Sequence, residues 1–293
     1  MDIRTLGYLR FSAIHVDEWA TFAGDILGAM VVLDAATGVV RVRIDAHAAR
    51  LTIEPGDADR LLAAGWEMAD ARALRLAESE LAAAGVSVAW FDAAGALARN
   101  VEAGFSFTDP GGNTVELFHS PLHADDPVRL HPEVGGFVTD DMGLGHVVLP
   151  AGDSDETFDF YINVLGFVHR DSMLVAPPGV VPYRMRFLAC NPRHHSVALT
   201  QAKAPQGLRH VMFHMRDVID VGKAFDRANH AGVLNTSIGQ HSNDLMLSFY
   251  AAAPGGIDVE IATLGERHDN STWRARELVA WKAWGYEQPK VAR

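Results

Sequence analysis

The chain contains a single cysteine, Cys190, among 293 residues. One thiol excludes an intrachain disulfide and suits a reducing compartment, so we expect a cytoplasmic protein. No apolar run approaches the roughly 20 residues that a membrane-spanning helix needs, and Met1–Phe11 is too short and too mixed to be a signal peptide. We therefore expect no membrane partner.

Basic residues are also scarce. The chain has 25 Lys and Arg against 37 Asp and Glu, a formal net charge of −12, and it has no basic tract. Binding to nucleic acid needs a positively charged surface, so we expect no nucleic-acid partner. Apolar residues, by contrast, make up 48% of the chain, which is enough for a sizeable core. The length allows one large domain or two of about 140 residues each.

The chain repeats itself. Residues 6–28 and 144–166 both begin and end with Leu-Gly, at the same spacing. Residues 110–116 and 254–260 both begin with Pro-Gly-Gly and end with Val-Glu. The repeat therefore predicts two similar halves, joined by the stretch 120–140.

Each half divides into two smaller units with the pattern strand, helix, several strands. Apolar residues at helical spacing predict helices over residues 17–27, 71–84, 155–164 and 218–231. Runs rich in β-branched residues predict strands over 3–11, 31–32, 39–44, 49–53, 66–68, 185–190, 196–200, 246–250 and 258–262. Because a βαβββ unit has one apolar sheet face, pairing two units closes a curved sheet around an interior. We predict an α+β fold in which four βαβββ modules form two barrel-like domains, a non-catalytic one over 1–133 and a catalytic one over 134–293.

Three residues, His146, His210 and Glu260, are candidate metal ligands. We expect them on the first strand of the third unit, which begins at Gly145, on the first strand of the fourth unit, which begins at Arg209, and on the last strand of the fourth unit. Two imidazoles and one carboxylate form the facial triad that holds non-haem Fe(II) and leaves positions open for small ligands. Taken singly, each residue is weak evidence, because a His in an apolar strand is more often a core residue and a strand Glu usually faces solvent.

The repeat strengthens this interpretation. It aligns the three candidates, in chain order, with Tyr8, with Ala63 or Ala64, and with Glu116. The first half thus carries the scaffold without the two imidazoles. We interpret Glu116 as a solvent-facing or structural residue.

A family resemblance is carried by four segments: Gly143–His146, Asn191–Ser196, His241–Tyr250 and Pro254–Glu260. They resemble the type I extradiol catechol dioxygenases, the two-domain members of the vicinal oxygen chelate superfamily, and the resemblance covers almost the whole chain. Within that family the chain is most similar to enzymes for 2,3-dihydroxybiphenyl and steroid-derived catechols. The resemblance implies Fe(II) on the three candidate ligands, with Mn(II) less favoured, since ligand type alone does not separate the two.

The resemblance also implies catalytic roles for His195, His241, Asp244 and Tyr250. His195 is the candidate acid and base, a role typically worth about 10²–10⁴-fold in rate. Tyr250 would hydrogen-bond the deprotonated catechol oxygen, and His241 and Asp244 would orient the substrate hydroxyls. We interpret the neighbouring His194 as a structural residue on the other side of a strand.

The substrate pocket beyond the metal is expected to be apolar, to hold a ring substituent. Alternation and motif position predict the substrate-binding residues Val148, Val175, Phe187, Ala198 and Asn243. The apolar ones are equally compatible with a core position. The tail over 273–284 predicts an amphipathic segment that packs on the C-terminal domain or on a neighbouring subunit.

These features predict the extradiol cleavage of a catechol, an aryl- or ring-substituted or polycyclic one, with O₂ as co-substrate and a homo-oligomer as the assembly. Two other classes share the scaffold. Glyoxalase-type lyases and isomerases use a divalent metal with a fourth protein ligand, and metal-free members bind small molecules. The two imidazoles of the second half favour the dioxygenase.

Overall fold

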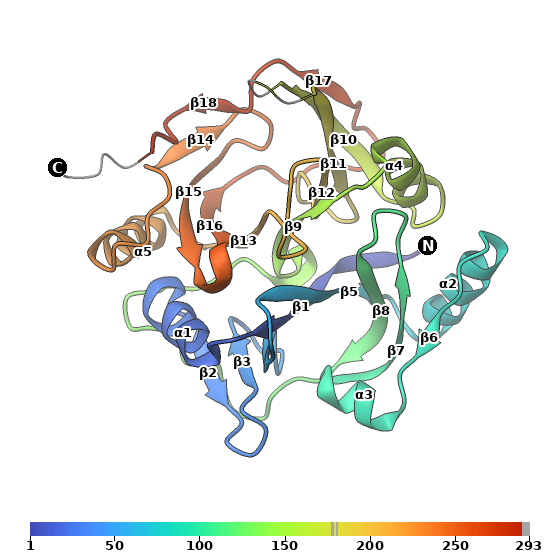
Figure 1. The fold of residues 1–293 in the computed structure, drawn as a ribbon, viewed down its shortest axis with the longest axis horizontal. Helices are drawn as coiled ribbons and strands as arrows, with labels where there is room; N and C mark the ends of the chain where they lie inside the picture. Colours follow the sequence, from blue (N-terminus) through green and yellow to red (C-terminus); the bar gives the residue numbers. More distant parts are fainter. Residues whose placement is uncertain (177–178, 180, 289–293) are drawn as a thin grey trace.

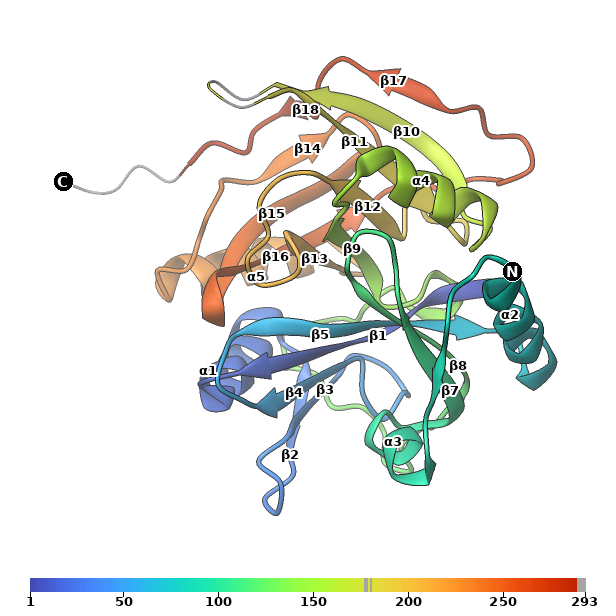
Figure 2. The same cartoon turned by 45° about the vertical axis from the view of Figure 1, so that its right-hand side comes forward.

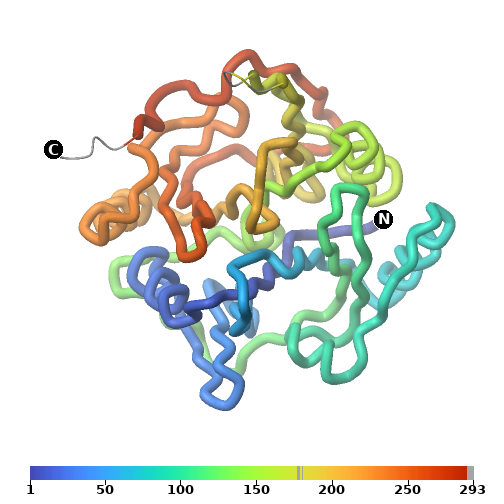
Figure 3. Tube along the Cα trace, in the orientation of Figure 1, coloured from blue at the N-terminus to red at the C-terminus, as the bar shows by residue number. Residues whose placement is uncertain are grey.

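The structure is a computed structural model that describes residues 1–176, 179 and 181–288. Within these residues the strands form two curved sheets, one of eight strands from the first half of the chain and one of ten from the second. Figure 1 shows the two sheets one above the other, and the tube in Figure 3 follows the chain from the lower layer (blue to green) into the upper layer (yellow to red).

The first sheet contains β1 (Ile3–Ala13), β2 (Met30–Leu33), β3 (Val40–Arg43), β4 (Leu51–Pro55), β5 (Arg60–Met68), β6 (Ala89–Trp90), β7 (Val101–Thr108) and β8 (Thr114–Pro121). Its strand order is β2-β3-β4-β1-β5-β8-β7-β6. The second sheet contains β9 (Gly145–Pro150), β10 (Val168–Val175), β11 (Tyr183–Ala189), β12 (Val197–Thr200), β13 (His210–His214), β14 (Gly239–His241), β15 (Met246–Ala253), β16 (Ile257–Leu264), β17 (Arg276–Leu278) and β18 (Lys282–Trp284). Its strand order is β17-β10-β11-β12-β9-β13-β16-β15-β14-β18.

Strand pairing confirms the four predicted modules. In each module the first strand pairs in parallel with the last, β1 with β4, β5 with β8, β9 with β12 and β13 with β16. The first strands of neighbouring modules pair in antiparallel fashion, β1 with β5 and β9 with β13. Apart from the outer β17 and β18, the two sheets therefore have the same layout.

One main helix follows the first strand of each module. The helices are α1 (Val16–Thr21), which continues as a π-helical turn over Phe22–Leu27, α2 (Ala71–Ala83), α3 (Ala93–Ala98), α4 (Ser154–Asn163) and α5 (Val218–His230). Asp70, Asp153 and Asp217 cap three of them by accepting hydrogen bonds from backbone N–H groups of the first turn. Gly85 and Gly232 follow α2 and α5 with φ angles of 78° and 72°, where the left-handed conformation favours glycine.

The described helices lack the combination of length and apolar composition that crossing a bilayer requires.

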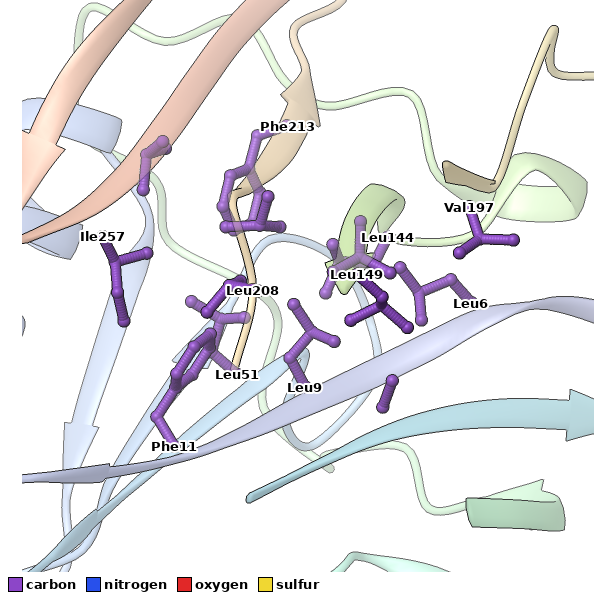
Figure 4. Close-up of a cluster of buried hydrophobic side chains, with 14 of the residues drawn as sticks. Leu6, Leu9, Phe11, Leu51, Leu144, Leu149, Val197, Leu208, Phe213 and Ile257 are labelled. Atoms are coloured by element: carbon purple, nitrogen blue, oxygen red, sulfur yellow. The ribbon is translucent and has the colours of Figure 1, made fainter. Parts of the chain in front are cut away.

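One continuous apolar core lies between the two sheets. Figure 4 shows side chains from both halves meeting there, among them Leu9 of β1, Leu149 of β9 and Phe213 of β13. Each such side chain contributes about 1.5–3 kcal/mol when fully buried. Because successive strand residues point to opposite faces, His146 and Val148 of β9 lie on the other face of the second sheet. The core thus holds the strands that carry the candidate ligands.

In the second sheet, β10, β14 and the tail differ from expectation. The sequence did not predict β10, because the fully buried Arg170 and Asp171 at its centre interrupt the apolar alternation. The tail over 273–284, expected to be one amphipathic segment, instead contributes β17 and β18. These strands pair with β10 and β14 at the two outer edges of the sheet (Figure 2).

Candidate metal centre and substrate pocket

Three neighbouring strands at the middle of the second sheet, β9, β13 and β16, carry the candidate ligands. His146 stands opposite Met212 on β13, and Met212 stands opposite Glu260 on β16. His210 lies two residues before Met212 on the same strand. Residues at opposed register positions, or two apart along a strand, share one face of a sheet. All three candidate ligands therefore lie on the face that points away from the core.

The ligand atoms of these three residues lie close together. His146 Nε2 is 3.1 Å from His210 Nε2, and the two nitrogens are 3.3 Å and 3.4 Å from Glu260 Oε2. Ligand atoms about 2.1 Å from an ion lie about 3.0–3.4 Å apart in octahedral or tetrahedral coordination. The three atoms thus have the spacing of ligands that share one metal ion.

The protonation of the group also fits a metal. Burial lowers the pKa of His146 to about 4, so its imidazole is neutral, the form that binds metals. Burial opposes the charge of Glu260, but the imidazoles of His146, His210 and His241 outweigh it and hold the pKa of Glu260 well below its usual range. Glu260 Oε2 is buried and lacks a hydrogen-bond donor of good geometry among the described residues. A buried anionic oxygen without a donor is the atom that a cation would satisfy.

The other oxygen of Glu260 is held by the protein. Oε1 accepts hydrogen bonds from Ser248 Oγ at 2.6 Å and from His241 Nε2 at 3.2 Å. Ser248 Oγ is in turn 2.7 Å from the hydroxyl of Tyr286, whose ring stacks on His241 with centroids 4.6 Å apart. These contacts leave Oε2 directed at the two imidazoles. The sequence did not predict Ser248 or Tyr286, because nothing in their spacing distinguishes them from core residues.

In the first half, arginine side chains bind the glutamate that corresponds to Glu260. Tyr8 stands opposite Gly65, and Gly65 stands opposite Glu116, the same register as in the second half. Glu116 is buried and accepts hydrogen bonds from Tyr8 Oη at 2.6 Å, Arg99 Nη2 at 2.6 Å and Arg10 Nη1 at 3.2 Å. The prediction of a structural role for Glu116 is therefore correct, and that of a solvent-facing one is wrong.

The aromatic ring of Tyr8 occupies the space above Gly65, where a Cβ would meet that ring at 2.4 Å. The register also resolves the remaining alignment, because Gly65 corresponds to Met212 and His210 therefore corresponds to Ala63. In this half, guanidinium groups supply the positive charge beside the carboxylate. The first half thus shows how this scaffold neutralises the buried glutamate without a metal.

Replacing Glu116 by Gln tests this structural role. We expect a loss of about 3–5 kcal/mol in the free energy of unfolding, because Arg99 and Arg10 lose a buried charged partner. Metal content should stay at the wild-type level, since Glu116 lies on the other sheet. Chemical denaturation and metal analysis of the purified variant check both points. An unchanged unfolding free energy would contradict the structural role.

A cavity of about 360 Å³ opens beside the candidate ligands. This volume lies within the range of about 300–1,000 Å³ that is common for small-molecule sites. Polar residues gather at the end near the ligands: His195, His241, Asn243, Asp244 and Tyr250. Much of the rest is apolar, from Val148, Met173, Val175, Met185, Phe187 and Leu278, and the polar Tyr183, Thr200, Arg209 and Asp258 also line the cavity.

The structure brings together nearly all of the residues that the sequence singled out. Ala198 differs, because it is fully buried in the cluster with Val148, Met173 and Phe187 and is not among the lining residues. It shapes the wall from behind. Leu278 belongs to the tail, whose β17 forms part of the cavity rim. The sequence suggested where the tail packs but not which of its residues reach the cavity.

His241 and Tyr250 form a hydrogen-bonded pair beside Glu260. His241 Nε2 is 3.0 Å from Tyr250 Oη, and Nδ1 is 3.0 Å from the carbonyl oxygen of Trp281. Burial would lower the pKa of His241, but Glu260 and Asp244 raise it to about 9. Burial and the charge of Glu260 raise the pKa of Tyr250 well above its usual value, so its hydroxyl keeps its proton.

His195 stacks on the candidate ligand His146, with ring centroids 4.0 Å apart. Burial, together with the neighbouring imidazoles, holds the pKa of His195 well below its usual value, so the ring is neutral. The interpretation of His194 as a residue on the other side of a strand is wrong. Both residues lie in the loop between β11 and β12, and His194 Nδ1 is 3.1 Å from His195 Nδ1.

Comparisons with known proteins agree with this geometry. The pattern of the Glyoxalase/Bleomycin resistance protein/Dioxygenase superfamily matches residues 143–261, and that of the dihydroxybiphenyl dioxygenase BphC D1 family matches residues 6–56. An iron-dependent extradiol dioxygenase of Rhodococcus jostii (strain RHA1) is 39% identical and covers 98% of both chains. A biphenyl-2,3-diol 1,2-dioxygenase of Metapseudomonas furukawaii is 36% identical over 98% of this chain and 94% of its own length.

Among solved structures, that of BphC, a halotolerant catechol dioxygenase, is similar with a TM-score of 0.90 and 30% identity. The match covers 98% of this chain and 95% of that chain. The likeness therefore extends over both sheets.

Proposed function

Because the chain belongs to the extradiol dioxygenases of the glyoxalase and dioxygenase superfamily, we propose that it cleaves a catechol ring beside its two hydroxyls, using O₂ and Fe(II). The ligands in this proposal are His146, His210 and Glu260. One observation carries it. The ligand atoms of these residues lie within 3.4 Å of one another at the wall of a cavity, and one of them is an otherwise unpaired carboxylate oxygen.

Iron(II), when bound, supplies a centre that can hold the catechol oxygens and pass electrons between the ring and O₂. The protein's own part is to set the charge and to hold protons. Two neutral imidazoles and one carboxylate would leave a net charge of +1 at the site, which suits a catecholate monoanion.

Three polar side chains would handle protons around the substrate. Tyr250 keeps its phenolic proton and lies beside Glu260, so it can donate a hydrogen bond to a deprotonated catechol oxygen. His241 orients that phenol through the 3.0 Å contact between its Nε2 and Tyr250 Oη. His195, neutral and stacked on His146, can accept a proton and return it. Asn243 and Asp244 line the same end of the cavity and would position the substrate hydroxyls.

The apolar end of the cavity supports a substituted catechol as the substrate. Val148, Val175 and Phe187 carry no polar group, and the volume of about 360 Å³ lies within the range of about 300–1,000 Å³ that is common for small-molecule pockets. We therefore propose an aryl- or ring-substituted catechol. The name of the Metapseudomonas relative agrees with this class of substrate.

Filling the apolar end should separate large from small substrates. We expect Val175→Trp to lower kcat/KM for 2,3-dihydroxybiphenyl by about 10-fold or more, since displacing a hydrophobic group from its pocket costs about 1–3 kcal/mol. Val175 is partly exposed, so the fold should accept the larger side chain. Unsubstituted catechol should change much less, because it does not reach this end. Equal losses for both substrates in steady-state assays would contradict the assignment of the pocket.

The other two classes on this scaffold are less well supported. Glyoxalase-type enzymes need a fourth protein ligand, and His241, whose imidazole lies beside Glu260, is already hydrogen-bonded to Glu260 and Tyr250. In a metal-free binding protein, the buried Oε2 of Glu260 would have no donor of good geometry among the described residues. Arginines supply such donors to Glu116 in the first half, whereas Glu260 is surrounded by imidazoles.

Ring cleavage gives a direct test. Protein loaded with Fe(II) under anaerobic conditions and then mixed with 2,3-dihydroxybiphenyl in aerated buffer should turn yellow within minutes, as the ring-opened semialdehyde-type product forms. Mn(II)-loaded protein should be run in parallel, because the ligand types do not separate the two metals. No product with this substrate and with simpler catechols would overturn the proposal.

We further propose a cytoplasmic homo-oligomer with domains over 1–133 and 134–293. The single cysteine is consistent with the compartment, and the repeat supports the division. Size-exclusion chromatography with light scattering would measure the subunit number, and a monomer would contradict the proposed assembly.

A further inference from the structure

A series of hydrogen-bonded polar side chains leads away from the cavity, and the ring-cleavage proposal uses only its inner end, His195. His195 is joined to His194 by the 3.1 Å contact between their Nδ1 atoms. His194 Nε2 is 2.9 Å from Asp171 Oδ2, at the centre of β10. Arg276 of β17 donates to both oxygens of Asp171, from Nε at 3.0 Å and from Nη2 at 2.7 Å. The order is Arg276, Asp171, His194, His195, ending at the cavity.

Asp171, His194 and His195 are closed off from water, whereas Arg276, at the outer end, is about half exposed. Asp171 and His194 are both buried, and Arg170 Nε donates to the carbonyl oxygen of His194 at 3.1 Å. The rings of His268 and Trp273 pack edge-on against the imidazole of His194, each with centroids 5.6 Å away. Water therefore has little access to substitute for a missing partner, and each ring nitrogen must find its proton or its acceptor within the series.

The negative charge of Asp171 determines which nitrogen of His194 carries a proton. Burial would raise the pKa of Asp171, but hydrogen bonds from His194 and Arg276 outweigh it and lower that pKa, so the carboxylate is ionised. An ionised carboxylate only accepts hydrogen bonds, so His194 Nε2 carries a proton. In a neutral imidazole the nitrogen without the proton is a hydrogen-bond acceptor. His194 Nδ1 is therefore the acceptor.

The position of the proton on His195 follows from that on His194. Because His194 Nδ1 accepts, His195 Nδ1 must donate. The alternative acceptor for that proton, Asp244 Oδ2, lies 3.8 Å away, beyond hydrogen-bond distance. A neutral imidazole carries one proton, so His195 Nε2 keeps its lone pair, and this is the ring nitrogen left for the cavity that His195 lines.

We propose that Asp171 and His194 are positioning residues that hold His195 with its proton on Nδ1 and its unprotonated Nε2 toward the substrate. The catalytic consequence rests on the proposed function, whereas the position of the proton does not. A carboxylate that fixes the tautomer of a histidine base through its far nitrogen is the logic of the hydrolase triad. Here the imidazole of His194 lies between the carboxylate of Asp171 and the base, His195, and links the two by hydrogen bonds.

The position of the proton can be measured directly. In full-length protein labelled with ¹⁵N-histidine and loaded with diamagnetic Zn(II), and again without metal, long-range ¹H–¹⁵N correlation reports which nitrogen of each ring is protonated. A His195→Gln variant identifies the signals of His195. We expect the proton of His195 on Nδ1 in the wild type. In His194→Leu, His195 should no longer carry its proton on Nδ1 alone. Arg276 still pairs with Asp171 in this variant, which protects the fold.

Two further variants serve as controls. His194→Asn can place an amide oxygen close to the position of Nδ1 and should retain the Nδ1 proton of His195 in part. His268→Phe removes an imidazole that packs on His194 without a hydrogen bond in the series, and it should leave the pattern unchanged. A proton on Nε2 of His195 in the wild type, or an unchanged pattern in His194→Leu, would overturn the proposal.

Turnover gives the second readout. With Fe(II) and 2,3-dihydroxybiphenyl, His194→Leu should lower kcat by about 10- to 100-fold, the usual cost of losing a partner that orients a functional side chain. KM and iron content should stay within about twofold, and His268→Phe should match the wild type. If wild-type protein cleaves catechols and His194→Leu keeps full kcat, the positioning role of His194 is wrong and the proposed function stands. If the wild type cleaves none, the proposed function fails, and the proton measurement still decides the inference.

Discussion

Replacing Glu260 by Gln is expected to remove iron from the protein. The two imidazoles would then face a neutral amide, whose NH₂ group repels a cation, and the site would lose its one anionic ligand. Iron per subunit should fall to the background of the buffer, and turnover should fall by at least about 10³-fold, because the reaction depends on the metal. Anaerobic purification followed by metal analysis measures the first quantity, and steady-state assay the second.

The repeat supplies the matched control for this prediction. Glu116 occupies the same register position in the first sheet and is equally buried, so Glu116→Gln makes the same chemical change there. We expect the two variants to lose different properties, metal content in one and stability in the other. Glu260→Gln loses metal and keeps most of its stability, and Glu116→Gln keeps metal and loses stability. Full iron content in Glu260→Gln would remove this residue from the ligand set.

Replacing His195 by Gln is expected to leave iron in place and to lower kcat by about 10²–10⁴-fold, the range for loss of a general acid or base. His195 stacks on His146 but contributes no atom to the three ligands, so metal binding should survive. The expected signature is a fall in kcat with little change in KM and with unchanged metal content. An unchanged kcat would exclude His195 from proton transfer. A loss of iron would instead show that its packing supports the ligand set.

The candidate metal centre could be predicted because its candidate ligands follow from local pattern and from the repeat. Strand alternation places His146 and Glu260 on the face opposite the core, and the Pro-Gly-Gly turn before β16 marks the strand that carries Glu260. The comparison of the two halves then separates two added imidazoles from the shared glutamate. The α+β fold with four modules follows from the same repeat and agrees with the strand pairing.

The parts that escaped prediction depend on contacts between distant segments. A glutamate in a strand is expected to face solvent. Glu116 is stable in a buried position because Arg10 and Arg99, which lie in other segments of the chain, donate hydrogen bonds to it. Asp171 interrupts an apolar strand, and its partner Arg276 lies 105 residues away in sequence. Tyr286 supports Glu260 through Ser248 from the far end of the tail. No local spacing encodes these pairs.

The central claim is that a His₂Glu centre in the second sheet cleaves catechols with O₂. Its most direct test is simultaneous measurement of O₂ uptake and ring-opened product with Fe(II)-loaded wild type and Glu260→Gln. A dioxygenase should consume one O₂ for each product formed, and Glu260→Gln should show neither signal. Wild-type protein that retains iron but shows no coupled uptake and product across aryl-substituted and simple catechols would contradict the claim.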